Sequence, residues 1–181
     1  MRLSSETLSR LPESVARPGY DRSAQAAGIV HFGIGAFHRA HQAWYTDRAM
    51  ARGDRDWGII GVSLRSANVA RQLNPQDGLY TLTECSAERN RMRVIGSVQR
   101  VIVASEEPEA VIAQIAAPET RIVTFTVTEK GYCRAADGSL DPFLAHHGSI
   151  YAFLEHGLRR RREQGLPGLT LLSCDNLALN G

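Results

Sequence analysis

Residues 29–42, "IVHFGIGAFHRAHQ", combine an apolar run, a Gly-x-Gly pair and a segment with helical spacing. A strand, a glycine turn and a helix in this order present free backbone N–H groups and the positive end of a helix dipole to an anion. In such a turn Gly33 permits the tight bend, and Gly35 lets a pyrophosphate approach the backbone. The pair alone is a weak signal, because ordinary strand-to-helix turns also contain Gly-x-Gly.

Position 38, where a dinucleotide fingerprint has its third glycine, is a histidine. The third glycine serves close packing of helix on strand, so His38 is compatible with phosphate binding but requires different packing. Arg39, in the first helical turn, is placed to donate to a phosphate. His38 and His41 are spaced i, i+3 on one helical face. No third ligand lies nearby, and zinc takes three or four protein ligands, so we expect no metal site and interpret both histidines as packing or hydrogen-bonding residues.

Two other polar segments follow predicted strands. Glu129 comes after the β-branched segment 121–128. A carboxylate there can bind a ribose hydroxyl, orient a catalytic group, relay a proton or simply occupy a surface turn. Asn176 comes after segment 169–172. Its amide suits a substrate oxygen or the nicotinamide, while Asp175 and Asn176 equally suit an Asx turn or a helix N-cap. The residues alone do not choose between these roles.

The elements that must position these residues alternate between strand and helix, which favours an α/β domain with a mainly parallel sheet. Two of the strands flank a polar loop and predict a β-hairpin insertion, and residues 142–148 are predicted as loop. Apolar segments predict strands at 28–32, 57–64, 79–84, 92–98, 101–104, 121–128 and 169–172, and helical spacing predicts helices at 36–50, 108–116 and 149–163, with a short helix capped by Ser66.

Ligands of such sheets gather beyond the carboxyl ends of the strands. The turn Gly33-Ile34-Gly35 and the segments 128–131 and 173–176 each follow a predicted strand. We therefore expect these three strand ends to form one rim.

Bulk composition excludes several classes of protein. With Lys+Arg 21 and Asp+Glu 19, the net charge of +2 creates no general field toward nucleic acid or a membrane. Cys85, Cys133 and Cys174 form no C-x-x-C pair and fit a reducing compartment. Residues 1–27 form a polar N-terminal arm without the apolar core of a signal peptide, and no apolar stretch approaches the ~20 residues of a membrane span. We expect a cytoplasmic protein without nucleic-acid or membrane partners.

Residues 159–162 are four consecutive arginines in the last turns of the helix predicted at 149–163. Consecutive residues spread around a helix, so these four cannot all face one ligand. Cations are also favourable at the negative end of a helix dipole. We interpret the run as a solvated helix end.

Four segments carry a family resemblance: "GIGAFHRAHQ" at 33–42, "QDGLYTLTE" at 76–84, "RIVTFTVTEKGYC" at 121–133 and "LRRRREQGLPGLTLLSCDNLALNG" at 158–181. In this order they resemble the N-terminal domain of the polyol-specific long-chain dehydrogenase/reductase family, which includes mannitol dehydrogenases and fructuronate reductases. The resemblance covers the chain from about Pro18. It implies a Rossmann-type, doubly wound domain over 28–181, with helices on both faces of the sheet.

The resemblance also implies a site for NAD, with NADP not excluded, in which His38 is a normal part of the turn. Asn176 matches a family asparagine that helps to hold the reacting oxygen of the substrate. The strand at 57–64 is followed by Arg65 and not by the acid that favours NAD, so Arg65 is a candidate to meet a 2′-phosphate. The implied cofactor residues are Gly33, Gly35, Phe37, His38, Arg39, Thr128, Glu129 and Gly131, with Tyr132 beside the nicotinamide.

The implied chemistry is metal-free hydride transfer between the nicotinamide and a secondary alcohol or ketone of a sugar or hexuronate. The family's general acid–base is a lysine in a Lys-x-x-x-x-Asn-x-x-His motif of a C-terminal helical domain. Lys130 is the one lysine among these 181 residues. The catalytic lysine and the helical domain are thus absent from them, and we expect a cofactor-binding fragment that is inactive alone.

Within the family, the segments resemble the fructuronate reductases slightly more closely. Because the two domains of the family close over the substrate, we also expect self-association through an exposed interdomain face. The alternative from another class is a non-catalytic nucleotide-binding or interaction module.

Overall fold

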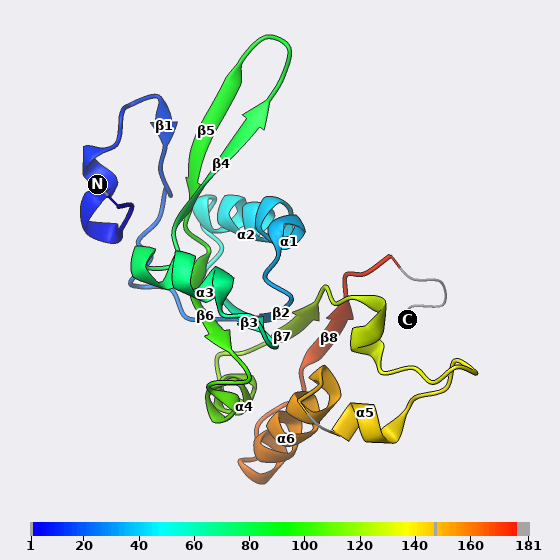
Figure 1. Cartoon of the computed structure of the whole chain (residues 1–181). Coiled ribbons are helices and arrows are strands. Elements are labelled where there is room, and N and C mark those ends of the chain that lie inside the picture. Colours follow the sequence, from blue (N-terminus) through cyan, green and yellow to red (C-terminus); the bar gives the residue numbers. More distant parts are fainter. Residues whose placement is uncertain (1, 147, 177–181) are drawn as a thin grey trace.

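The computed structural model describes residues 2–146 and 148–176, whose arrangement is shown in Figure 1. The main sheet has five strands in the order β6-β3-β2-β7-β8, and every neighbouring pair is parallel. With β2 in the centre and later strands added on either side, this is the strand order of a doubly wound sheet, which confirms the predicted fold class. The strands are β2 (Ile29–Phe32), β3 (Ile59–Ser63), β6 (Val98–Val103), β7 (Ile122–Phe125) and β8 (Thr170–Ser173).

Helices cover both faces of this sheet (Figure 1). The helices α4 (Pro108–Ala116) and α6 (Ile150–Glu163) share a buried core with Val30 and Phe32 of β2. The helices α2 (Gln42–Ala51) and α3 (Asn68–Leu73) share the other core with Ile29. Successive side chains of a strand point to opposite faces, so an apolar strand such as β2 supplies both cores. Within the described residues, no helix is long and apolar enough to cross a membrane.

A second, three-stranded sheet projects from the main sheet (Figure 1). The strands β4 (Tyr80–Cys85) and β5 (Asn90–Ile95) pair antiparallel, which confirms the predicted hairpin. The N-terminal segment, predicted to be irregular, contains a 3-10 helix, η1 (Ser5–Arg10), and a strand, β1 (Val15–Ala16), that pairs parallel with β5. Apolar side chains of this segment pack on the base of the hairpin: Leu3, Leu8, Leu11 and Val15.

The strand predicted at 92–98 is wrong as one element, because the chain changes sheets inside it. β5 ends at Ile95, and β6 begins at Val98 in the main sheet. Both residues between them are held by α2: Gly96 N donates to Asp47 Oδ1 at 2.8 Å, and Ser97 Oγ donates to the Ala43 carbonyl at 2.7 Å. These contacts join residues far apart in sequence, so local hydrophobicity carries no sign of the switch.

Two other helix boundaries differ from the prediction. The helix predicted at 36–50 is broken at His41 (φ −117°, ψ −90°) into α1 (Ala36–Ala40) and α2. The segment predicted as loop contains α5 (Pro142–His146). Asp141 Oδ1 accepts from the backbone N–H groups of Phe143 and Leu144, at 2.9 and 3.1 Å. An aspartate followed by proline is a helix-start signal, and the prediction missed it.

The arginine run of α6 is not uniformly solvated, so that interpretation is wrong for Arg161. Its side chain is only 2% exposed. Nη1 donates to the carbonyls of Ala117 and Ile115 at 2.6 and 3.2 Å, and Nε donates to the Pro167 carbonyl at 3.0 Å. Arg161 therefore caps the carboxyl end of α4, whose last carbonyls have no partner within their own helix. Arg160 pairs with Glu109 on the surface of α4 at 2.6 Å.

Candidate functional site

The expected rim exists. Residues Phe32, Phe125 and Ser173 are neighbours in register across β2, β7 and β8. The three polar segments that follow these strands therefore begin side by side at the carboxyl end of the sheet, where ligands of doubly wound proteins bind.

The turn after β2 requires glycine at its first position. Gly33 has φ +96°, a conformation that residues with a Cβ rarely adopt. A Cβ here would lie 1.8 Å from the carbonyl oxygen of Thr126, on the neighbouring segment after β7. Gly33 N donates to the Val62 carbonyl of β3 at 2.9 Å. The turn is thus wedged between the ends of β3 and β7, with no room for a side chain.

Gly35 has a different environment. It is exposed and precedes α1, and a Cβ added to it would meet only the Gly33 carbonyl oxygen, at 3.8 Å. Packing within the described residues therefore does not require glycine here, which leaves open backbone for a ligand to approach, as a pyrophosphate needs. The expected contribution of a long helix dipole is reduced, because the break at His41 leaves α1 only five residues long.

A buried polar cluster supports the turn from inside. His31 of β2 is 0% exposed, and its Nε2 lies 3.1 Å from Thr126 Oγ1. Thr126 Oγ1 donates its one proton to the Gly33 carbonyl at 2.9 Å, so it accepts from His31 Nε2–H. His31 Nδ1 lies 2.6 Å from Thr124 Oγ1, which donates to Gln42 Oε1 at 3.2 Å. The network ties the Gly33 carbonyl to β7.

His38 belongs to this cluster and not to the ligand-facing surface, which corrects its expected role in cofactor contact. Its ring is 1% exposed and stacks on His31, with centroids 3.5 Å apart. Neither ring nitrogen has a hydrogen-bond partner among the described residues. Burial lowers the pKa of His38 to about 4, and the nearby side chain of Gln42 opposes this by favouring the protonated ring. Burial, together with His38, also lowers the pKa of His31 well below 6.5.

The remaining turn residues lie on the surface. Phe37 is 61% exposed and stacks on His41, with centroids 5.3 Å apart. His41 therefore points away from buried His38, and the described residues contain no group of three potential metal ligands. Arg39 is half-buried and Nη1 donates to the Ile34 carbonyl at 2.8 Å, which leaves its other N–H donors for an anion. Arg65 is exposed beyond the end of β3, the strand next to β2.

The segment after β7 forms a 3-10 helix, η3 (Glu129–Tyr132), beginning after exposed Thr128. Gly131 N donates to the Thr128 carbonyl at 2.6 Å, and a Cβ on Gly131 would lie 2.8 Å from Val127 Cβ. The glycine is therefore required by the turn itself. The side chain of Glu129 lies outside the part of the chain that the structure describes.

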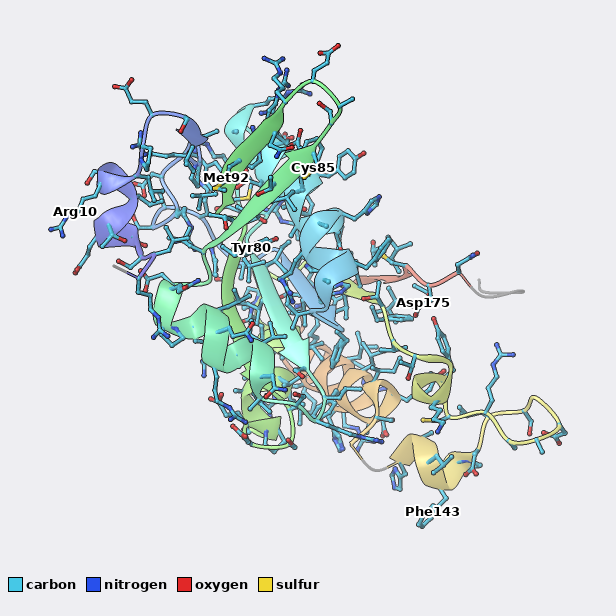
Figure 2. All side chains as sticks on the ribbon, turned by 45° about the horizontal axis from the view of Figure 1, so that its top comes forward. Arg10, Tyr80, Cys85, Met92, Phe143 and Asp175 are labelled. Atoms are coloured by element: carbon cyan, nitrogen blue, oxygen red, sulfur yellow. The ribbon has the colours of Figure 1, made fainter. Side chains whose placement is uncertain are left out.

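Asp175, labelled in Figure 2, follows β8 and contacts the segment after β7. Its Oδ2 accepts from Val127 N at 3.0 Å and from the Tyr132 hydroxyl at 2.7 Å. Tyr132, expected beside the nicotinamide, is 7% exposed and its hydroxyl also lies 2.6 Å from Ser173 Oγ. Both side chains thus fix the rim, and neighbouring Asn176 is left exposed on it. Sequence reasoning offered Asp175 only as a local turn or cap.

Comparison with known proteins agrees with this geometry. A family described as the mannitol dehydrogenase Rossmann domain matches residues 27–181. The chain is 42% identical to a D-mannonate oxidoreductase of Escherichia coli over 96% of its length, and 41% identical to a mannitol 2-dehydrogenase of Pyricularia oryzae over 93%. It spans only 38% and 37% of those two proteins.

A solved structure has the same fold. The Pseudomonas fluorescens mannitol 2-dehydrogenase, in ternary complex with NAD and D-mannitol, superposes with a TM-score of 0.91 at 40% sequence identity. The match covers 100% of this chain and 40% of that one.

Proposed function

The chain belongs to the mannitol dehydrogenase family, and from this premise we propose that residues 28–181 are the cofactor-binding portion of an NAD-dependent oxidoreductase. The observation that carries the proposal is the contrast between the two glycines of the turn. Gly33 is demanded by the fold, since a Cβ would meet Thr126, whereas a Cβ on Gly35 would make only an ordinary contact, at 3.8 Å, with the Gly33 carbonyl oxygen. A glycine that packing does not need, at the end of the central strand, suits the backbone approach of a pyrophosphate.

The other turn and rim residues complete the proposed site. Arg39 has free N–H donors for a phosphate, and exposed Phe37 offers a ring surface beside the turn. Thr128, Glu129 and Gly131 are proposed to lie on the nicotinamide side, because they follow β7, the strand next to β2. When bound, the nicotinamide supplies or accepts the hydride that is exchanged with a secondary alcohol or ketone. The residues of this chain bind and orient that cofactor.

The proposed substrate of the complete protein is a polyol or a sugar acid. The two relatives compared above carry a hexonate and a hexitol in their names and differ by one percentage point in identity, 42% and 41%. Identity therefore does not choose between them. Asn176, exposed at the end of the β8 segment, is proposed to donate its amide to the reacting oxygen of the substrate.

Titration of the purified chain with NADH, followed by nucleotide fluorescence, tests cofactor binding. Gly35→Val is expected to keep the folded circular dichroism spectrum and to weaken NADH binding at least tenfold, because its side chain enters the space of the pyrophosphate. Gly168→Val is the matched control, since Gly168 is also exposed with nothing within 4 Å of an added Cβ. Equal affinities of the two variants, or no binding by the unmodified chain, would sink the proposal.

A further inference from the structure

A basic groove lies between α2 and the β4–β5 hairpin, away from the cofactor turn. It has a volume of about 630 Å³. In Figure 2 the hairpin, marked by Cys85 and Met92, extends away from the end of β8, marked by Asp175. Neither Gly33 nor Gly35 lines the groove. The aromatic and charged side chains that line it are Trp44, Tyr45, Arg48, Arg52, Glu84, Arg89, Arg91 and Arg93.

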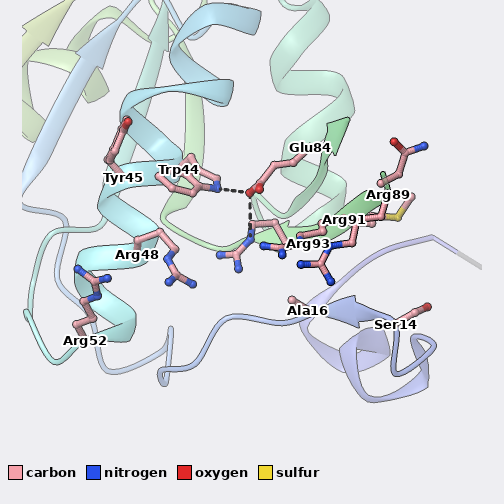
Figure 3. Close-up of a pocket in the computed structure, with 12 residues that line it drawn as sticks. Ser14, Ala16, Trp44, Tyr45, Arg48, Arg52, Glu84, Arg89, Arg91 and Arg93 are labelled. Atoms are coloured by element: carbon pink, nitrogen blue, oxygen red, sulfur yellow. Dashed lines mark hydrogen bonds and ion pairs between the residues drawn. The ribbon is translucent and has the colours of Figure 1, made fainter. Parts of the chain in front are cut away.

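Two secondary-structure elements supply the positive charge (Figure 3). Arg48 lies on α2, Arg52 is the C-cap residue of that helix, and both line the groove. Arg91 and Arg93 are two residues apart on β5 and so project from one face of that strand, and Arg89, in the hairpin loop just before β5, also lines the groove. Five guanidinium groups therefore line one groove.

The groove contains little compensating negative charge. Glu84, its one acidic lining residue, accepts from Trp44 Nε1 at 3.1 Å and lies 3.9 Å from Arg93 Nε. Arg93 also faces Asp47 at 4.0 Å. Within the described chain, no ion pair involves the other four arginines of the groove. Four unpaired cations on facing walls repel one another, and a bound anion relieves that repulsion.

The chemistry of the groove indicates what the anion is. Guanidinium forks bind phosphate oxygens bidentately, so an all-arginine set favours phosphoryl groups. The volume is in the ~300–1,000 Å³ range of small-molecule sites. A long polyanion is disfavoured, because Glu84 and Glu88 interrupt the positive charge at the hairpin turn and the whole chain has a net charge of only +2. Tyr45, 59% exposed in the groove wall, adds an aromatic surface.

We propose that this groove is a binding site for a compact polyanion with at least two phosphoryl groups, held by Arg48 and Arg52 on one wall and by Arg89 and Arg91 on the other. Such a ligand is either an inorganic polyphosphate or a nucleoside polyphosphate. In the second case the base stacks on Tyr45. The site is independent of the cofactor turn and does not rest on the proposed oxidoreductase function.

Calorimetric titration of the chain with tripolyphosphate and, separately, with ATP at low ionic strength tests the proposal. Arg89→Glu/Arg91→Glu is expected to weaken tripolyphosphate binding at least tenfold, and Arg48→Glu/Arg52→Glu is expected to do the same from the opposite wall. Arg71→Glu/Arg162→Glu is the control with the same change in net charge. Both of its arginines are exposed and neither lines the groove, so less than a twofold effect is expected.

The two ligands distinguish the sources of the phosphate. Equal affinity for the two ligands shows that the groove recognises the phosphates alone. Tighter binding of ATP shows that it takes a nucleotide, provided that Tyr45→Ala removes the difference. Both results support the site. The proposal is overturned if the unmodified chain binds neither ligand, or if the control loses as much affinity as the groove variants. It is also overturned if Gly35→Val, which alters the cofactor turn and not the groove, weakens tripolyphosphate binding as much as the groove variants do. A poly-glutamate peptide that binds more tightly than tripolyphosphate would identify an acidic protein segment as the occupant and would likewise overturn it.

Discussion

Arg65 is exposed just beyond β3, where an acid would be placed to bind the ribose hydroxyls of NAD. We expect Arg65→Ala to weaken NADPH binding about tenfold and to leave NADH binding unchanged, since a charge-assisted contact to the 2′-phosphate is worth roughly 1.5–3 kcal/mol at most. Fluorescence titration with both cofactors measures the ratio. An unchanged ratio would remove Arg65 from cofactor discrimination, and Arg71→Ala, another exposed arginine, serves as the control.

Two effects disfavour a side chain at Gly33: its positive φ and its close contact with Thr126. Comparison with a glycine that has only a positive φ separates their costs in the free energy of unfolding. Gly33→Ala combines a positive φ with a contact of 1.8 Å to the Thr126 carbonyl. Gly138→Ala has a positive φ of +85° with nothing within 4 Å of the added Cβ. We expect a loss of about 1 kcal/mol or more in the free energy of unfolding for Gly138→Ala, and a clearly larger loss for Gly33→Ala. Urea denaturation measures both, and equal losses would show that the turn yields to the new methyl group.

At the scale of single residues, the sequence located the turn glycines but not the polar cluster beneath them. Gly33 and Gly35 follow from their place after an apolar run. His31 gave no signal, because it stands inside that run and its partners Thr124 and Thr126 lie on another strand. The residues alone predicted a packing role for His38, in agreement with its burial, whereas the family resemblance implied a cofactor contact, because motif position does not reveal burial. Only the packing of α1 on β2 turns its ring inward onto His31.

At the scale of elements, the buried Arg161 connects α6 to the end of α4. Arg161→Met keeps the apolar contacts of the side chain but leaves the carbonyls of Ile115 and Ala117 without that donor. We expect a loss of roughly 2–4 kcal/mol in the free energy of unfolding, the range for breaking a buried hydrogen-bond network around a charged group. Arg162→Met, at an exposed site, should stay within about 0.5 kcal/mol of the unmodified chain. Similar values for the two variants in urea denaturation would contradict the capping role.

The position of Arg161 was open to prediction from helical spacing. The buried face of α6 includes Ile150, Leu154 and Gly157, and residue 161 continues the same face one turn beyond Gly157. Treating the four arginines as one charged block concealed this periodicity. By contrast, the carbonyls that receive the guanidinium belong to α4, and no local pattern identifies them.

The stacked pair of His31 and His38 joins β2 to α1 and makes stability depend on pH. Burial lowers both pKa values, to about 4 for His38, so the folded chain keeps these rings neutral below pH 6.5 while the unfolded chain protonates them. The contribution of the two neutral histidines to the free energy of unfolding is therefore fully present above pH 6.5. It falls as the pH drops toward 4, by up to ~1.4 kcal/mol per pH unit for each histidine.

Urea denaturation at pH 7, 6 and 5 measures this loss. His38→Phe preserves a stacked ring and removes one titrating group. The free energy of unfolding should then fall less steeply with decreasing pH, by about the ~1.4 kcal/mol per pH unit that one proton contributes. His156→Phe, at an exposed site, should leave the slope nearly unchanged. An unaltered slope in His38→Phe would show that the acid sensitivity originates elsewhere.

At the scale of the molecule, the alternation of apolar strands and helices was sufficient to predict the parallel sheet and the hairpin, and the family resemblance implied a helical layer on each face. The exchange of the chain between sheets at Gly96 and Ser97 was not predictable, because side chains and carbonyls of α2 determine it. The pairing of β1 with β5 was hidden for a similar reason, since two residues are too few to show a strand period. Local pattern thus identifies the elements, and long-range hydrogen bonds determine where they meet.

The outer edge of the main sheet leads to a prediction about association. β8 ends the strand order of the described chain, and its consecutive residues Leu171 and Leu172 are 44% and 50% exposed on opposite faces. An apolar edge strand with unpaired backbone groups readily pairs with another chain. We propose that the 181-residue chain self-associates through β8. The self-association expected from the sequence would then occur at the β8 edge of the main sheet.

Sedimentation velocity over a range of protein concentrations tests this proposal. The unmodified chain should shift toward dimers as concentration rises, and Leu171→Lys/Leu172→Lys should remain monomeric, because the edge then carries charge on both faces. Leu140→Lys/Leu144→Lys changes two leucines of similar exposure, 51% and 49%, at and near α5, and should associate like the unmodified chain. Loss of association in both variants would mean that added charge alone keeps the chains apart. Loss in the β8 variant alone would locate the contact at the edge next to Asn176, so association and substrate access would compete for the same rim.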